Sequence, residues 1–368
     1  MFIFHGNCFS SEKIIETGKE TLGITDFLNS AKEYTSEVFE DINLTELFSD
    51  LSKGKFSTSS IKTKILKMFS NELLKTAIIM IDILIVIIIH SILNAIIEDL
   101  SNSNTGKIAY FIQYLIIATL IVKASKNIIE LTVQCIEDLN NFMNLLIPLL
   151  TTLSIATGSI TTANLIQPVL LLVISISSNF ITNFIIPCVT ITIILSIISN
   201  ISDKVQIGKL SKFFKSSIIW ILGIILTIFI GVLSLEGTLG SSVDGLTAKT
   251  AKAAVSNFIP VVGKILGDSV DAVIGSANLL KNTVGVIGVI VILAIVISPL
   301  IKILVLWIYF KITSAICEII ADKKITKLIE QISDGYKILL GVLLAVLVMF
   351  IIGITLVLKM TNSSLMYR

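Results

Sequence analysis

The sequence predicts an all-helical integral membrane protein with about eight to ten transmembrane helices. Of its 368 residues, 54% are hydrophobic and 15% are charged, and the mean hydropathy is +0.95. A soluble domain carries about 25% charged residues. Several stretches also approach or exceed the roughly 20 apolar residues that a helix needs to cross a bilayer. These observations exclude a soluble enzyme, a fibrous protein and a disordered chain.

The first 75 residues differ from the rest of the chain. Their apolar residues recur at loosely helical spacing, and charges of both signs fill the gaps. We therefore expect residues 1–75 to be a soluble or interfacial helical region, residues 76–358 to be the membrane domain and residues 359–368 to be a C-terminal tail. Residues 1–4 have only a short apolar run without a basic region, so we do not expect them to be a complete signal peptide; the alternative is the tail of one whose start lies upstream.

Charges, prolines and glycines divide the membrane domain into predicted spans. The uncharged run of residues 139–202 is long enough for three crossings. We expect turns at residues 158–162 and 177–182 and a break at Pro299. The other predicted spans are residues 76–97, 108–122, 216–235, 282–301, 300–320 and 338–358.

The proline spacing suggests a tandem internal repeat. Pro148 and Pro260 are separated by the same number of residues as Pro187 and Pro299. Two repeat units would cover residues 108–200 and 216–320, each with four spans, and the last span would begin a third copy. The alternative is chance similarity among isoleucine-rich helices.

Two lysine clusters carry the orientation signal. One contains Lys204, Lys209, Lys212 and Lys215, and the other contains Lys323, Lys324, Lys327 and Lys337. Lysine-rich short loops favour the cytoplasm, and placing both clusters there needs an even number of crossings between them. We therefore expect residues 246–280 to cross the membrane, which gives ten spans with both termini outside.

The segment 246–280 also holds the candidate functional residues. Ionisable residues at membrane depth usually face a protein interior or a water path, and glycines four residues apart allow close helix contact. The segment is either a polar helix lining a pathway or an amphipathic helix lying in the membrane interface. The candidate pathway or packing residues are Pro260, Gly263, Lys264, Gly267, Asp268 and Asp271.

Known catalytic and cofactor motifs are missing from the sequence. The four cysteines are scattered and form no CxxC pair, which argues against a zinc site or a disulfide framework. Phosphate-binding loops, HExxH and GxSxG motifs are likewise missing. The net charge of +2 gives no case for nucleic acid. We therefore expect neither an enzyme nor a bound metal or cofactor.

Four segments carry a resemblance to a known family. They are DGLTAKTAK at residues 244–252, NFIPVVGK at 257–264, GDSVD at 267–271 and ANLLKNTVG at 277–285. With these segments the chain resembles the stage III sporulation protein AE family from about residue 76 onward. Family members usually begin with a signal sequence, and this chain departs from the family there.

The resemblance implies a function that composition alone does not. Such proteins lie in the mother-cell membrane around the forespore, as subunits of a channel or feeding-tube complex needed for forespore development. The implied partners are other stage III A-operon proteins, including a secretion-type ATPase and ring-forming components, and the forespore stage II Q protein. Membrane lipid is the expected surrounding. The alternative is a self-contained secondary transporter, which repeats and proline-broken helices would suit.

Overall fold

The computed structural model describes residues 19, 21–35, 44–53, 59–98, 104–201, 207–258 and 262–365. Within these ranges every regular element is a helix, which confirms the predicted all-helical class. The elements are α2 (Ile24–Thr35), α3 (Leu44–Ser52), α4 (Ser59–Glu98), α5 (Asn104–Ala156), α6 (Ile160–Phe180), the π-helix η1 (Ile181–Ile185), α7 (Ile186–Ile201), α8 (Gly208–Phe258), α9 (Val262–Ile320) and α10 (Lys323–Leu365).

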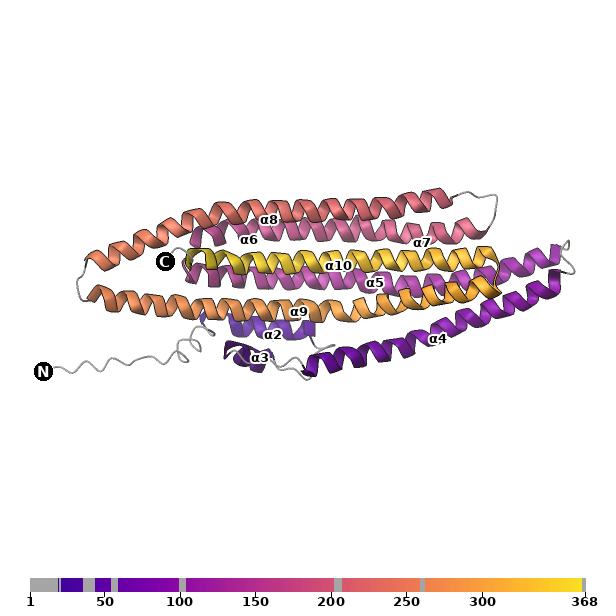
Figure 1. Cartoon of the computed structure of the whole chain (residues 1–368), viewed down its shortest axis with the longest axis horizontal. Coiled ribbons are helices and arrows are strands. Elements are labelled where there is room, and N and C mark those ends of the chain that lie inside the picture. The colour runs from indigo at the N-terminus through magenta and orange to yellow at the C-terminus, as the bar shows by residue number, and fades with distance from the viewer. Residues whose placement is uncertain are drawn as a thin grey trace.

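Five long helical rods form the main bundle in the described part of the chain, and the long helix α4 packs beside them. Helices α5, α8, α9 and α10 and the continuous rod α6–η1–α7 lie side by side along the longest axis (Figure 1). Helix α10 packs against α9, α8, α7, α5 and α6, so it occupies the centre of the bundle. Helix α4 lies along α9 and part of α5, and α2 and α3 pack on α9.

Several of the predicted short spans are wrong because neighbouring spans join into continuous helices, whereas 216–235 and 338–358 lie almost wholly within the candidate membrane helices Gly208–Ser234 and Lys323–Lys359. The turn near Gly158 is confirmed, since Gly158 has φ +92° between α5 and α6. The turn predicted at 177–182 is a helix instead, and α9 continues through Pro299. Likewise, residues 246–258 belong to α8 and residues 262–280 belong to α9, so 246–280 is not one crossing.

Local bonding explains why two prolines do not break their helices. The π-helix Ile181–Ile185 ends two residues before Pro187, and such bulges absorb a disrupted hydrogen-bond ladder. Pro299 has no N–H for the carbonyl of Ile295, four residues earlier. The thiol of Cys135 on α5 donates to that carbonyl at 3.8 Å between sulfur and oxygen. A side chain of a neighbouring helix thus replaces the lost backbone bond.

Four of the described helices are long and apolar enough to cross a membrane. They cover Ile160–Ile201, Gly208–Ser234, Ile274–Ile320 and Lys323–Lys359. The first has 42 residues, or about 63 Å at 1.5 Å per residue, while the hydrocarbon core is about 30 Å thick. The rods are therefore longer than one bilayer crossing requires. The proposed repeat units 108–200 and 216–320 correspond to the hairpins α5/α6–α7 and α8/α9, and common ancestry stays a prediction.

Small residues allow the long helices to approach closely. A Cβ atom placed on Gly288 of α9 would lie 2.5 Å from a methyl carbon of the buried Leu146 on α5. Gly223 of α8 is exposed, and no atom lies within 4 Å of a Cβ placed there. The first glycine is thus a packing requirement and the second is not.

We predict that Gly288→Val destabilises the protein by about 1–3 kcal/mol, because the added side chain overpacks a close helix contact. Gly223→Val is the matched control, with an expected effect within about 0.5 kcal/mol. Thermal unfolding of the two variants in detergent measures the difference. Equal melting temperatures would contradict the close packing of α5 against α9.

Candidate functional site

Three neighbouring helices have uncharged segments at one common level. These segments are residues 216–235 of α8, 282–301 of α9 and 338–358 of α10. The α8 and α10 segments are aligned by Lys215, which contacts Asp334. The α9 and α10 segments are aligned by Phe310, whose ring lies 5.1 Å from that of Tyr336, and by Gly288, which lies against Ile354. We call this shared level the uncharged zone.

Helix α5 runs through the same zone but differs in chemistry. The hydroxyls of Ser125 and Tyr336 are 2.9 Å apart, and Gly353 of α10 lies against Met143. α5 and α10 therefore run in parallel. A residue of α5 lies level with the α10 residue whose number is about 211 higher, as Ser125 does with Tyr336. Glu137 is then level with Val348, in the middle of the uncharged segment of α10.

The exposed side of α5 is polar through this zone. From Lys123 to Asn144 every exposed residue carries a polar or charged side chain. This stretch is about 33 Å long, close to the thickness of a bilayer core. We call it the α5 polar face, and its exposed members are Lys123, Lys126, Asn127, Glu130, Gln134, Glu137, Asn141 and Asn144.

The charges of the α5 polar face are only partly paired. Lys126 and Glu130 form an i,i+4 ion pair at 3.7 Å, with side chains 71% and 64% exposed. Glu137 adds a carboxylate near the middle of the zone. A carboxylate in hydrocarbon is costly, so such residues normally face water or a polar partner. This face can therefore border an aqueous space but is poorly suited to lipid.

Helix α2 lies beside this face and is polar on its outer side. Its inner residues Phe27 and Tyr34 contact Phe142 of α5, with ring centroids 5.9 and 5.8 Å apart. Burial, with the nearby carboxylates of Asp138 and Glu33, raises the pKa of the Tyr34 hydroxyl. All the exposed residues of α2 are polar: Thr25, Asp26, Asn29, Lys32 and Glu33. The flank formed by α2 and α5 is thus suited to water.

Helix α8 presents the opposite chemistry. Its candidate span is the least covered of the four. Its exposed residues include Ile219, Trp220 and Ile228, which are 63%, 71% and 58% exposed. Lipid is the natural surrounding for so wide an apolar surface. The bundle therefore has an apolar side on α8 and a polar side on α5.

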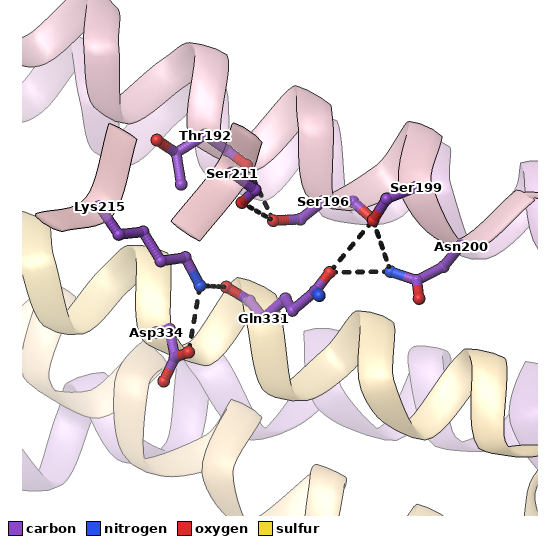
Figure 2. Close-up of polar contacts among 8 residues, drawn as sticks. All are labelled: Thr192, Ser196, Ser199, Asn200, Ser211, Lys215, Gln331 and Asp334. Atoms are coloured by element: carbon purple, nitrogen blue, oxygen red, sulfur yellow. Dashed lines mark hydrogen bonds and ion pairs between the residues drawn. The ribbon is translucent and has the colours of Figure 1, made fainter. Parts of the chain in front are cut away.

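A second group of polar residues joins α7, α8 and α10 at one end of the uncharged zone (Figure 2). The amide of Asn200 donates to Oε1 of Gln331 at 2.8 Å. Lys215 Nζ donates to the Gln331 carbonyl at 3.3 Å and to Asp334 Oδ2 at 3.1 Å. The hydroxyls of Ser196 and Ser211 lie 3.4 Å apart. We call this group the α7–α8–α10 polar cluster.

This cluster brings the two predicted lysine clusters to the same end of the bundle. Lys215 belongs to the first, and its partner Asp334 lies among the lysines of the second. An even number of long helices, α8 and α9, connects them. The fold is thus compatible with both lysine clusters lying on one side of the membrane. Two long helices connect them, however, where the sequence predicted four shorter spans. Their placement in the cytoplasm stays a prediction.

The candidate residues chosen from the sequence surround the tip of the α8/α9 hairpin. Helix α8 ends at Phe258 and α9 begins at Val262, and Pro260 lies outside the described residues, so its role stays a prediction. Gly263, Lys264, Gly267, Asp268 and Asp271 belong to the beginning of α9, but their burial and contacts lie outside what the structure describes, so their roles stay predictions. Sequence reasoning missed the α5 polar face because it treated residues 123–138, between the predicted span 108–122 and the uncharged run 139–202, as a connection. The helical spacing of Lys126, Glu130, Glu137 and Asn141 was the available signal.

Comparison with known proteins identifies the family. The family model described as stage III sporulation protein AE matches residues 42–361. The chain belongs to the stage III sporulation protein AE family. It is 32% identical over 266 residues to the stage III sporulation protein AE of Bacillus subtilis (strain 168). These aligned residues make up 72% of this chain and 67% of that protein. No solved structure matches the chain. The family is a sporulation family and not an enzyme family, and the long apolar helices make this member a membrane protein.

We predict that the buried part of the α7–α8–α10 polar cluster stabilises the bundle more than its ion pair does. The coupling between Asn200 and Gln331 should be about 0.6–1.7 kcal/mol, as for hydrogen bonds between membrane helices. The Lys215–Asp334 coupling should be about 0–1 kcal/mol, because Asp334 is 52% exposed. Two double-mutant cycles, with Asn200→Leu/Gln331→Leu and Lys215→Met/Asp334→Asn, measure both terms. A larger coupling for the ion pair would reverse this ranking.

Proposed function

We propose that this protein is a membrane subunit of the sporulation channel, or feeding-tube, complex joining mother cell and forespore. In this proposal the complex supports forespore development, and the α5 polar face lines part of its aqueous passage. The observation that carries the proposal is that Gln134, Glu137, Asn141 and Asn144 are exposed at the level where α8, α9 and α10 are uncharged.

The position of the polar face favours a complex over a self-contained transporter. A transporter binds its solute between the helices of its own chain. Here the Lys126 and Glu130 side chains are 71% and 64% exposed, so the face lies on the outside of the bundle. An outward polar face closes a passage only when other subunits supply the remaining walls. The continuous helices through Pro187 and Pro299 also remove the argument from proline-broken helices.

The proposed setting follows from the family. The protein would lie in the mother-cell membrane surrounding the forespore. Its partners would be other stage III A-operon proteins, including a secretion-type ATPase, and the forespore stage II Q protein. The two lysine clusters, at the end of the bundle where α8 and α10 begin, would then face the mother-cell cytoplasm, as lysine-rich loops generally do.

We predict that the double substitution Gln134→Leu/Glu137→Leu lowers spore yield without lowering the amount of protein in the membrane. Leucine removes the hydration of the passage, while exposed positions contribute within about 0.5 kcal/mol to stability. The amide variant Glu137→Gln keeps the face polar and should retain most spores. The control Ile219→Leu/Ile228→Leu changes the apolar side of α8 and should sporulate normally.

Purification tests the membership in a complex separately. The tagged full-length protein should co-purify from sporulating cells with the other stage III A-operon proteins. Normal spore yield in the leucine double variant would contradict the lining role of α5. Recovery of the protein alone, together with solute transport by the purified chain in liposomes, would instead establish the transporter alternative.

A further inference from the structure

Two asparagines interrupt an otherwise apolar surface on the rod α6–η1–α7. From Leu172 to Ile198 every exposed residue is apolar except Asn179 and Asn183. The exposed neighbours include Leu172 and Ile176, which are 57% and 60% exposed. This surface differs from the α5 polar face, where all the exposed neighbours are polar as well. Water therefore explains the α5 residues but not these two amides.

The amides lie deep within the uncharged zone. Asn200 bonds to Gln331, and Ile193 lies against Gly335, so α7 and α10 run antiparallel. The same register places Asn179 level with the residues around Val348, in the middle of the uncharged segment of α10. Asn179 and Asn183 also flank the midpoint of the candidate span Ile160–Ile201.

The hydrogen-bonding capacity of these side chains is largely unused within the chain. The Asn179 amide donates to Ser175 Oγ on its own helix at 3.4 Å, a long bond. Within the described part of the chain, no hydrogen bond to Asn183 is observed. A carboxamide in an apolar surrounding is costly without partners, and interhelical amide bonds are a common means of helix association in membranes.

We propose that Asn179 and Asn183 form the centre of a contact between two copies of this protein. Copies in one membrane share one orientation, so the two-fold axis of a dimer runs along the membrane normal. Residues of equal depth then meet themselves. A carboxamide both donates and accepts hydrogen bonds, so it can pair with its own symmetry copy, whereas a lysine or a glutamate would repel itself.

The surroundings of the two amides suit such a contact. Phe180 and Phe184 are 41% and 45% exposed, and their rings lie 5.0 Å apart next to the asparagines. They provide an apolar rim that excludes lipid and water from the amides. Asn183 lies within the π-helix Ile181–Ile185 and Asn179 lies two residues before it, and π-bulges of this kind are often found at functional positions.

Cysteine cross-linking of the full-length protein in its native membrane tests this contact. The native cysteines are first replaced, with Cys135→Ser to keep a donor and Cys8→Ala, Cys188→Ala and Cys317→Ala. Asn179→Cys or Asn183→Cys should then give, on oxidation, a product of twice the 40.1 kDa chain mass. Trp220→Cys is the matched control, since it is 71% exposed on the apolar side of α8 and should stay monomeric.

A second measurement tests the role of the amides themselves. Purified protein in liposomes is diluted with lipid, and the dimer fraction is counted by single-molecule photobleaching. Asn179→Leu/Asn183→Leu should weaken the dimer about tenfold, while the control Ile176→Leu/Ile191→Leu should leave it unchanged.

In the cross-linking experiment, the proposal is overturned if Trp220→Cys cross-links in preference to both asparagine positions, or if the mass of the adduct requires a different protein. In the photobleaching experiment, it is overturned if the asparagine double variant dimerises as well as the unmodified protein. The contact is independent of the channel proposal. If the α5 polar face proved inaccessible to water while the dimer still formed, the lining role of α5 would be refuted and the dimer contact would stand.

Discussion

Polar groups within or next to uncharged helix segments must find a partner or water, and the arrangement of this protein follows from that constraint. The α7–α8–α10 polar cluster satisfies it inside the bundle, where Asn200 bonds to Gln331. The thiol of Cys135 satisfies it for the backbone, since it donates to the carbonyl that Pro299 leaves without a partner. The α5 polar face meets the same constraint by remaining open to the outside. Each solution fixes which side of a helix faces protein, lipid or water.

The continuity of the helices determines at which level each of these polar groups lies. Because α6–η1–α7 passes Pro187 and α9 passes Pro299 without a break, each rod keeps its register along its whole length. The register then sets Glu137 of α5 beside the uncharged middle of α10. It also separates an apolar side on α8 from a polar side on α2 and α5. A subunit with two such sides can contact lipid with one and border an aqueous space with the other.

The sequence predicted the helical class of this fold better than the points at which its helices begin and end. The helical class, the turn at Gly158 and the common end of the two lysine clusters could be predicted, because each depends on local residues or on charge. The continuity of the rods could not, because it depends on contacts such as that between Cys135 and Ile295, which are 160 residues apart. The α5 polar face was missed for a related reason. Charged residues 123–138 looked like a connection, and only the packing against α10 shows their level.

The central claim is that the α5 polar face meets water at a depth where its neighbours are uncharged. Thiol accessibility in intact membranes tests it most directly, with single cysteines at Glu137→Cys on α5 and Ile228→Cys on α8, which lie at nearly the same level. A charged, water-soluble maleimide reacts only with hydrated thiolate. The account predicts fast labelling at position 137 and little or none at position 228. Equal protection of both positions would show that the α5 face is covered by lipid or protein and would contradict the aqueous passage.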